Sequence, residues 1–363
     1  RLGRTGRRPG ATRNTLFLAT REDAFLQAAG LLRLWRSGFV EPVVPPPSPR
    51  HISAQQLLAL ALQEGAFGRS GWRAWWGRLV AMEGAEEVLA YLVAEGFLES
   101  DGDLLFIGPA AERRFGRRNF MDLTAVFTAD PELKVVHGRT EIGSVSPTSV
   151  TTRLPEGQPR VLALAGRAWV VTHVDWRRRV VSVAMWQGRG RSRWGRGGTG
   201  LGRELAQSIR AVLLGDDPGV ALSRRGDATL ARLRVDRAGS VHPDATVLVP
   251  GAPDSMRWWT YAGAAANASL AAALSSSGFD ASADSLGVFV VGDVGHRGAA
   301  EAVRQAARDG LGAAPEVSAE ALEGLKFSAA LPIDVAAHVL ATRMSDPVVA
   351  ALVVEAPIRV VIT

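Results

Sequence analysis

The densest set of residues that could contact a charged ligand lies over residues 166–203. Nine arginines and one acidic residue, Asp175, occur there, and tryptophans are interleaved with the arginines. Guanidinium groups bind phosphate oxygens and indole rings stack on bases, so the combination is typical of proteins that hold single strands without reading their sequence. The alternative for this stretch is a solvated hairpin. The tryptophans are Trp169, Trp176, Trp186 and Trp194.

The immediate neighbours of these tryptophans differ, so we expect different environments for them. Trp169 lies in an apolar strand pattern and is expected in a core. Trp194 lies in the Gly- and Arg-rich stretch GRGRSRWGRGG and is expected to be exposed. The pair His173 and Asp175 shares one face of a predicted strand, where a polar sheet face explains it better than a metal or acid–base site.

Two further clusters lie earlier in the chain. Trp72, Trp75 and Trp76 fall on one face of a predicted helix, which favours core packing, although one indole could instead wedge against a base. Four arginines within residues 113–118 form a candidate patch for phosphate. The nucleic-acid contacts that we predict are Trp76, Arg113, Arg114, Arg117, Arg118, Arg139, Arg177 and Trp194.

The composition agrees with a nucleic-acid partner. The chain has 363 residues, a formal net charge of +6 and a pI of about 10.7, and of its 42 basic residues only Lys134 and Lys326 are lysines. GC-rich coding could account for the ratio of arginine to lysine but not for the clustering. The absence of cysteine excludes disulfides and thiolate metal sites. No apolar run reaches the ~18 residues of a membrane span, so we expect a cytoplasmic protein with no membrane partner.

Motifs of stand-alone enzymes are absent from the sequence. There is no GxxxxGK[ST] phosphate loop and no HExxH metal motif. The stretch GDVGHRG at residues 292–298 has the wrong spacing for a dinucleotide-binding turn and is better explained as a strand-to-helix turn. We therefore expect no metal, and no cofactor bound by this chain alone.

The order of the predicted elements indicates a multidomain α+β fold. A short buried strand at 15–19 and a helix at 21–38 precede a proline-rich linker. Helices at 51–65 and 69–80 come next, and residues 85–109 predict a third helix followed by a hairpin, the order of a winged helix. The predicted domains are 1–48, 49–124 (winged helix), 125–200 (small β-barrel or curled sheet) and 201–363 (α/β).

The first ten residues, RLGRTGRRPG, contain a spaced pair of arginines that suggests either a basic tail or a phosphate-handling motif. Gly3-Arg4-Thr5-Gly6-Arg7 resembles motif VI of superfamily 2 helicases, Q-x-x-G-R-x-G-R. Further stretches resemble the large helicase-related (Lhr) branch of bacterial helicases, and the resemblance covers essentially the whole chain. These stretches include HISAQQLLALALQEG, RRFGRRNFMDLTAVFTADPELKVVHGRTEIGSV, LALAGRAWVVTHVDWRRRVVSV, RWWTYAGAAANASLAAAL and LKFSAALP.

The resemblance implies the end of a second RecA-like domain over residues 1–48 and ATP-driven 3′-to-5′ translocation on single-stranded DNA, including unwinding of DNA–RNA hybrids in DNA repair. In that family Arg4 and Arg7 would be catalytic arginines that stabilise the γ-phosphate of ATP. ATP and Mg²⁺ would act only in the intact helicase, whose other RecA-like parts would be partners of this chain.

The departures from the family pattern are equally specific. The phosphate loop, the acidic Mg²⁺ motif and the leading Gln of motif VI do not occur, so the resemblance implies a C-terminal portion that does not hydrolyse ATP alone. The alternative is a stand-alone, non-enzymatic module that binds nucleic acid or serves in assembly.

Overall fold

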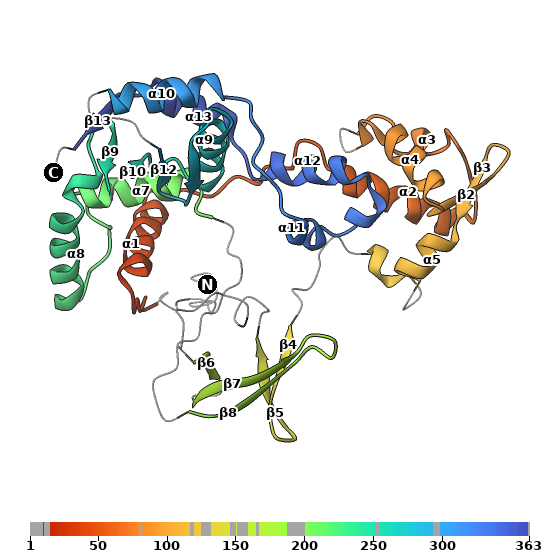
Figure 1. Cartoon of the computed structure of the whole chain (residues 1–363), viewed down its shortest axis with the longest axis horizontal. Coiled ribbons are helices and arrows are strands. Elements are labelled where there is room, and N and C mark those ends of the chain that lie inside the picture. Colours follow the sequence, from red (N-terminus) through yellow and green to blue (C-terminus); the bar gives the residue numbers. More distant parts are fainter. Residues whose placement is uncertain are drawn as a thin grey trace. The chain divides into compact units, whose positions relative to one another are not determined.

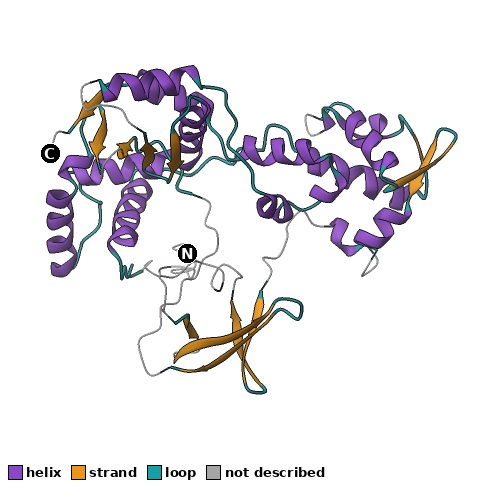
Figure 2. Ribbon diagram, in the orientation of Figure 1, coloured by secondary structure: helices purple, strands orange, loops and turns teal. Residues whose placement is uncertain are grey.

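The structure is a computed structural model with a mixed α+β fold that contains three sheets, which confirms the predicted α+β class (Figures 1 and 2). It describes residues 10, 15–79, 82–116, 120–124, 132–145, 150, 159–164, 167–186, 200–251, 255–292 and 298–361. The chain divides into two compact units. Unit 1 comprises 1–123, 200–322 and 327–363, and unit 2 comprises 124–199 and 323–326.

The first part of unit 1 is a helical lobe with a three-stranded sheet. The helix α2 buries several leucines against the core of the lobe. The helix α4 begins after Gly84, whose left-handed backbone conformation would strain a residue with a side chain. The predicted helix-then-hairpin order is confirmed, because β2 and β3 form an antiparallel pair directly after α4. The elements are α2 (Arg50–Glu64), β1 (Phe67–Gly68), α3 (Trp72–Trp76), α4 (Ala85–Ala94), β2 (Leu98–Asp101), β3 (Leu104–Ile107), α5 (Pro109–Phe115) and η3 (Met121–Thr124).

Residues near the C-terminus complete this helical lobe. The helix α12 (Ile333–Arg343) and the turn η5 (Ser328–Ala330) pack against α2. The buried Phe327 ring lies 5.6 Å from the ring of Phe115, which in turn lies 6.2 Å from Phe97. Segments more than 200 residues apart therefore share one core, whereas the sequence pattern predicted a single domain over 201–363.

A second core of unit 1 forms between its first helix and the helices after residue 200. The helix α1 (Glu22–Arg36) packs on α7 (Arg203–Leu214) so closely that a Cβ on Gly30 would lie 2.8 Å from Cγ1 of Ile209. The hydroxyl of Ser208 donates a hydrogen bond to the carbonyl of Gly30 at 2.8 Å. Gly30 thus permits the close approach of α1 and α7. The helix α8 (Arg224–Asp236) adds Leu230 and Leu233 to the same core, and the turn η4 (Ala238–Ser240) follows it.

The third part of unit 1 is a five-stranded sheet in the order β11-β12-β10-β9-β13, with antiparallel pairs except for the parallel β9–β13 pair. One face packs on three helices, as Figure 1 shows, and buries Trp258 completely. The elements are β9 (Thr246–Pro250), β10 (Ser255–Trp259), α9 (Ala264–Ser276), β11 (Asp280–Ala283), β12 (Gly287–Val291), α10 (Ala299–Asp309), α13 (Pro347–Glu355) and β13 (Ile358–Val360). The short helix α11 (Ala319–Gly324) follows α10 in the chain and is not part of this sheet.

Unit 2 is a separate five-stranded sheet in the order β5-β4-β8-β7-β6. Its core includes Trp169, as predicted, and the indole N–H donates to the carbonyl of Leu164 at 3.0 Å. A Cβ on Gly143 of β5 would lie 3.6 Å from Leu164 of β6, so the two edge strands approach and the sheet is curled. The strands are β4 (Leu133–His137), β5 (Thr140–Val145), β6 (Val161–Leu164), β7 (Arg167–Asp175) and β8 (Val180–Met185).

Two local predictions are wrong. Residues 15–19 form no strand, and Leu16 and Leu18 are exposed rather than buried, because no neighbouring strand in the described residues pairs with them. Of the helix predicted over 69–80, the described residues 69–79 are helical only over the five residues of α3, since Gly77 ends it. The proline-rich residues 42–47 are without helix or strand, as expected for a linker. The predicted strand at 125–129 lies outside the described residues.

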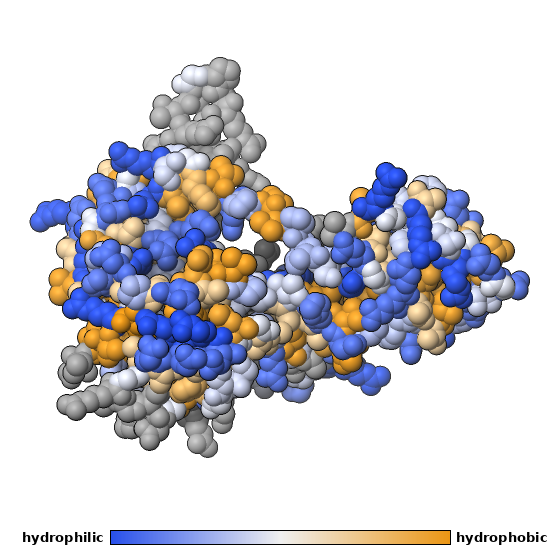
Figure 3. All heavy atoms as spheres, turned by 90° about the horizontal axis from the view of Figure 1, so that it is seen from above, coloured by the Kyte–Doolittle hydropathy of each residue, from blue (hydrophilic) through white to orange (hydrophobic). Residues whose placement is uncertain are grey.

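The surface carries apolar side chains among polar ones, as Figure 3 shows for one face. Within the residues that the structure describes, no single helix is long and apolar enough to cross a membrane. The pair α12 and α13, bent by 50° at the break between them, passes that test only when taken together, by length and composition.

His51 is a buried titratable group between α2 and α12. Its side chain is buried, and its Nδ1 has no hydrogen-bond partner in the described residues. Burial, followed by the nearby charge of Arg343, lowers the pKa of His51 from 6.5 to about 4. His51 therefore takes up a proton near pH 6.5 in the unfolded chain but only near pH 4 in the folded chain. Between these pH values, lowering the pH reduces the free energy of unfolding.

We predict that His51→Leu flattens the pH dependence of the free energy of unfolding between about pH 7 and about pH 4.5. The wild type should lose about 2 kcal/mol more than the variant over this interval, because only its unfolded state binds the extra proton. Urea unfolding at both pH values measures the difference. His338→Leu on the exposed side of α12 is the matched control, and equal losses in wild type and His51→Leu would contradict the prediction.

Candidate nucleic-acid interface

The turn between β7 and β8 presents one indole and three guanidinium groups to solvent. Trp176 is 52% exposed, and the side chains of Arg177, Arg178 and Arg179 are exposed as well. The backbone N–H of Arg178 donates to Oδ1 of Asp175 at 2.9 Å. This acid therefore caps the turn, which gives a role to one member of the pair that the sequence analysis had weighed as a metal or acid–base site.

The backbone of this turn, which we call the β7–β8 tip (residues 176–179), is held in place on its other side too. The amide of Lys134 at the start of β4 donates to the carbonyl of Arg179 at 2.9 Å, and Arg179 adopts a positive φ of 56°. A firmly held backbone with solvent-exposed cations and an indole can position stacking and phosphate contacts without ordering the chain first.

Arg139 does not lie near the β7–β8 tip. Arg139 occupies the turn after the end of β4. The tip lies at the start of β4, where Lys134 pairs with Val180 of β8. The two predicted contacts Arg139 and Arg177 are therefore at opposite ends of the same sheet. Met185 at the end of β8 and Trp186 directly after it are exposed at the other end of β8 from the tip.

The three tryptophans of α3 have three different environments. Trp72 is buried at 3% exposure, Trp76 is half-buried, and Trp75 is 56% exposed. The rings of Trp75 and Trp76 lie 6.2 Å apart with planes tilted by 43°. The predicted core position therefore holds for Trp72 alone. Trp75, which the sequence analysis did not select, presents more surface than Trp76.

Arginines precede and follow this exposed indole in the sequence. Arg73 donates to Oε1 of Glu86 at 2.5 Å, and this hydrogen bond lowers the pKa of that carboxyl group. The Arg73 guanidinium also lies 5.1 Å from the centre of the buried Trp72 ring on its own helix, and its hydrogen bond to Glu86 connects α3 to α4. Arg69 and Arg78 are exposed nearby in the sequence.

Arg113 and Arg114 are exposed on α5, and neither forms an ion pair within the described part of the chain. The helix is anchored by Phe115, whose ring packs against Phe97 and Phe327. Figure 1 shows α3 and α5 apart, with α4 and α2 between them, so Trp76 and this arginine pair do not form one continuous site. Arg4, Arg7, Arg117, Arg118 and Trp194 lie outside the described residues.

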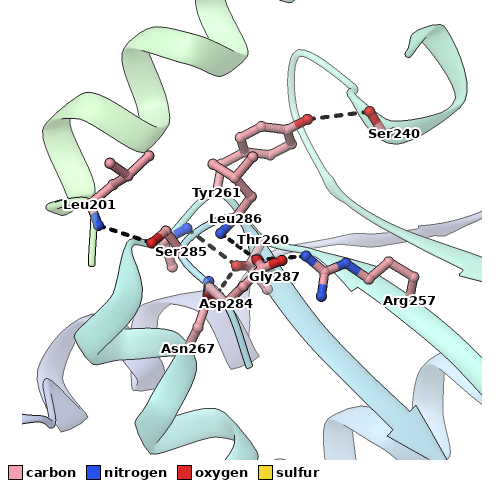
Figure 4. A network of polar contacts seen from close by, with 11 residues as sticks. Leu201, Ser240, Arg257, Thr260, Tyr261, Asn267, Asp284, Ser285, Leu286 and Gly287 are labelled. Atoms are coloured by element: carbon pink, nitrogen blue, oxygen red, sulfur yellow. Dashed lines mark hydrogen bonds and ion pairs between the residues drawn. The ribbon is translucent and has the colours of Figure 1, made fainter. Parts of the chain in front are cut away.

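A polar cluster in the five-stranded sheet of unit 1 centres on Asp284 (Figure 4). Its Oδ1 accepts from Nη2 of Arg257 at 2.6 Å and from the amides of Leu286 and Gly287 at 2.8 and 3.1 Å. The side chain of Asn267 on α9 donates to the Asp284 carbonyl at 2.9 Å and accepts from the Thr260 hydroxyl. The cluster ties the β11–β12 turn to β10 and α9.

A cavity of about 220 Å³ lies between α7, α13 and the start of β9. Arg210 projects toward it, and its Nη2 donates to the carbonyls of His242, Pro243 and Ala245, so this guanidinium holds the loop before β9. Burial lowers the pKa of Arg210. The described residues contain no group of three or more His, Asp or Glu side chains that could hold a metal ion.

A comparison with known protein families, curated proteins and solved structures finds no match for this chain.

We predict that Asp284→Asn and Asp284→Ala destabilise the protein to different extents. Asparagine retains an acceptor for the turn amides but removes the charge opposite the buried Arg257, which should reduce the free energy of unfolding by about 1 kcal/mol. Alanine removes both functions and should cost about 3 kcal/mol. Urea unfolding measures both values.

The control is Asp280→Ala, an exposed carboxylate on β11 for which the described residues show no hydrogen bond. Pairing Asp284→Ala with Arg257→Met should recover part of the lost stability, because no unpaired charge then stays buried. Equal stability of all single variants would contradict a structural role for the ion pair.

Proposed function

We propose that this chain binds single-stranded nucleic acid without sequence preference, as the nucleic-acid-engaging portion of an Lhr-type ATP-dependent helicase. The observation that carries the proposal is the β7–β8 tip, where Trp176 and three arginines share one rigid turn. Guanidinium contacts to phosphate would provide salt-dependent affinity, and a base stacked on the indole would be accepted whatever its identity.

The exposure of the tip residues supports this function over a purely structural one. A tryptophan needed only for packing would be buried, as Trp72, Trp169 and Trp258 are. Trp176 instead keeps half of its surface in water, and no ion pair of Arg177 or Arg179 occurs in the described residues. Such a surface gains free energy when a polyanion with flat bases covers it.

The helicase part of the proposal rests on the sequence resemblance. In an intact enzyme Arg4 and Arg7 would stabilise the γ-phosphate of ATP, and ATP with Mg²⁺ would supply the free energy for translocation in DNA repair. The role proposed for the described residues is to hold the strand.

A titration of a labelled oligothymidylate with the full chain, followed by fluorescence anisotropy from about 50 to about 200 mM salt, tests the proposal. We expect the logarithm of the binding constant to fall linearly with the logarithm of salt concentration. The double variant Arg177→Gln/Arg179→Gln should lower this slope by about 1.4, because two phosphate contacts to a single strand are lost. Trp176→Ala should weaken binding at least about fivefold with little change in slope.

The matched control is Arg21→Gln/Arg232→Gln, which removes the same charge from guanidinium groups that already pair with carboxylates. If both double variants weaken binding equally, only the net charge matters and the tip is not the interface. Binding that is absent at low salt, or that does not respond to salt, would refute the proposed function.

A further inference from the structure

The cavity of about 220 Å³ in unit 1 lies between one face of α7 and one face of α13. Arg203, Gln207 and Arg210 line it from α7, because spacings of four and three residues put them on one side of the helix. The α13 wall has a similar spacing but only apolar side chains. Its residues are Val349, Leu352, Val353 and Ala356. One wall of the cavity is therefore polar and the other is apolar.

Hydrogen bonds within the protein already satisfy the middle of the polar wall. The Gln207 side chain donates to the carbonyl of Tyr261 at 2.8 Å and accepts from Nη1 of Arg210 at 3.2 Å. Nη2 of Arg210 donates to carbonyls of the loop before β9. Oγ1 of Thr246, also in the lining, accepts from the indole N–H of Trp258 at 2.9 Å. The centre of the cavity therefore suits the apolar part of a ligand.

Two charged side chains of the lining are not engaged in this way. Arg203 at the first position of α7 and Asp244 in the loop before β9 are exposed, and neither side chain forms an ion pair or a hydrogen bond within the described residues. The carboxylates of Glu41 and Glu204 lie beside Gly202 but do not line the cavity. The cavity therefore offers one guanidinium group and one carboxylate to a ligand.

These two charged groups lie at different ends of the cavity. Asp244 follows Pro243, whose carbonyl accepts from Nη2 of Arg210 at 2.9 Å, so Asp244 belongs to the end that holds Arg210. Arg203 lies two helical turns before Arg210 on the same face of α7, about 10 Å away along the helix axis. Arg203 and Asp244 therefore do not neutralise each other, and a ligand that pairs with both must carry separated charges.

We propose that this cavity binds a small zwitterion whose ammonium and carboxylate groups are separated by a short apolar chain. The ligand carboxylate contacts the guanidinium group of Arg203, and the ammonium group contacts the carboxylate of Asp244. The chain lies against Leu352 of α13, which is 58% exposed and gains an apolar contact when it is covered. The inference does not depend on the proposed function, because it uses no residue of the β7–β8 tip.

The size and the charges of the cavity distinguish this ligand from others. A volume of about 220 Å³ is below the ~300–1,000 Å³ of sites for drug-sized ligands, so a nucleotide does not fit. A simple carboxylate leaves Asp244 unpaired, and a simple amine leaves Arg203 unpaired. An α-amino acid such as leucine carries both charges on one carbon atom and does not reach both side chains.

Saturation-transfer NMR of the full chain with 6-aminohexanoate tests the site, because this probe has the required charges at the two ends of a methylene chain. We expect saturable binding with a dissociation constant on the order of 1 mM, as for other ligands of this size. Hexanoate lacks the ammonium group, hexylamine lacks the carboxylate, and leucine lacks the separation between them. Each of these three should bind about tenfold more weakly than 6-aminohexanoate.

Two substitutions assign each ligand charge to its residue. Arg203→Gln should weaken 6-aminohexanoate binding about tenfold and leave hexylamine binding unchanged. Asp244→Asn should weaken 6-aminohexanoate binding to a similar extent and leave hexanoate binding unchanged. The matched controls are Arg225→Gln and Asp227→Asn on α8, which remove exposed charges that do not line the cavity. Thermal unfolding by circular dichroism shows whether each variant is folded.

The outcomes separate this site from the proposed function. An absence of saturable 6-aminohexanoate binding up to about 10 mM would overturn the site. Equal weakening by the α8 variants, or leucine binding as tightly as 6-aminohexanoate, would overturn it as well. None of these results bears on the β7–β8 tip, which the oligothymidylate titration tests by itself. We expect 6-aminohexanoate to leave oligothymidylate binding unchanged.

Discussion

The alternation of side chains along β10 is the constraint on which the C-terminal sheet depends. Trp258 is completely buried against the helices, and its indole N–H is satisfied by the Thr246 hydroxyl at 2.9 Å. Once that indole is inside, pleating forces Arg257 and Trp259 to the other face, because neighbours in a strand point in opposite directions. The guanidinium group then needs partners at a surface that water only partly reaches, and Asp284, Trp259 and Phe289 provide them.

The arginines of this protein perform two different physical tasks. Arg210 and Arg234 donate to backbone carbonyls and hold loops, and Arg257 is enclosed by rings. Arg113 and Arg177 stand free in solvent. Five rigid donors allow one guanidinium to satisfy several carbonyls at once, which the compact ammonium group of lysine does less well. The arginines therefore serve internal scaffolding as well as supplying cations that face solvent.

The helical lobe shows how a core can be assembled from distant segments. Phe97 and Phe115 meet Phe327 only because the chain returns after the five-stranded sheet, and α12 then covers α2. Such non-local contacts leave no trace in local periodicity, since each helix shows only that one of its faces is apolar. For this reason the sequence pattern could not show that the helical lobe includes residues from near the C-terminus.

The amino-acid sequence alone determined the local elements and the character of the surface. Periodicity located α1 and α2, and also α4 with its following β2–β3 hairpin, because apolar spacing follows directly from helix and strand geometry. The clustering of arginine and tryptophan pointed to residues 166–203, which include the β7–β8 tip. Tertiary structure alone decided which tryptophan is exposed, that Arg139 and Arg177 lie at opposite ends of a sheet, and that Phe289 is backed by Arg257. Those properties depend on strand register and on distant packing partners, which a single sequence does not contain.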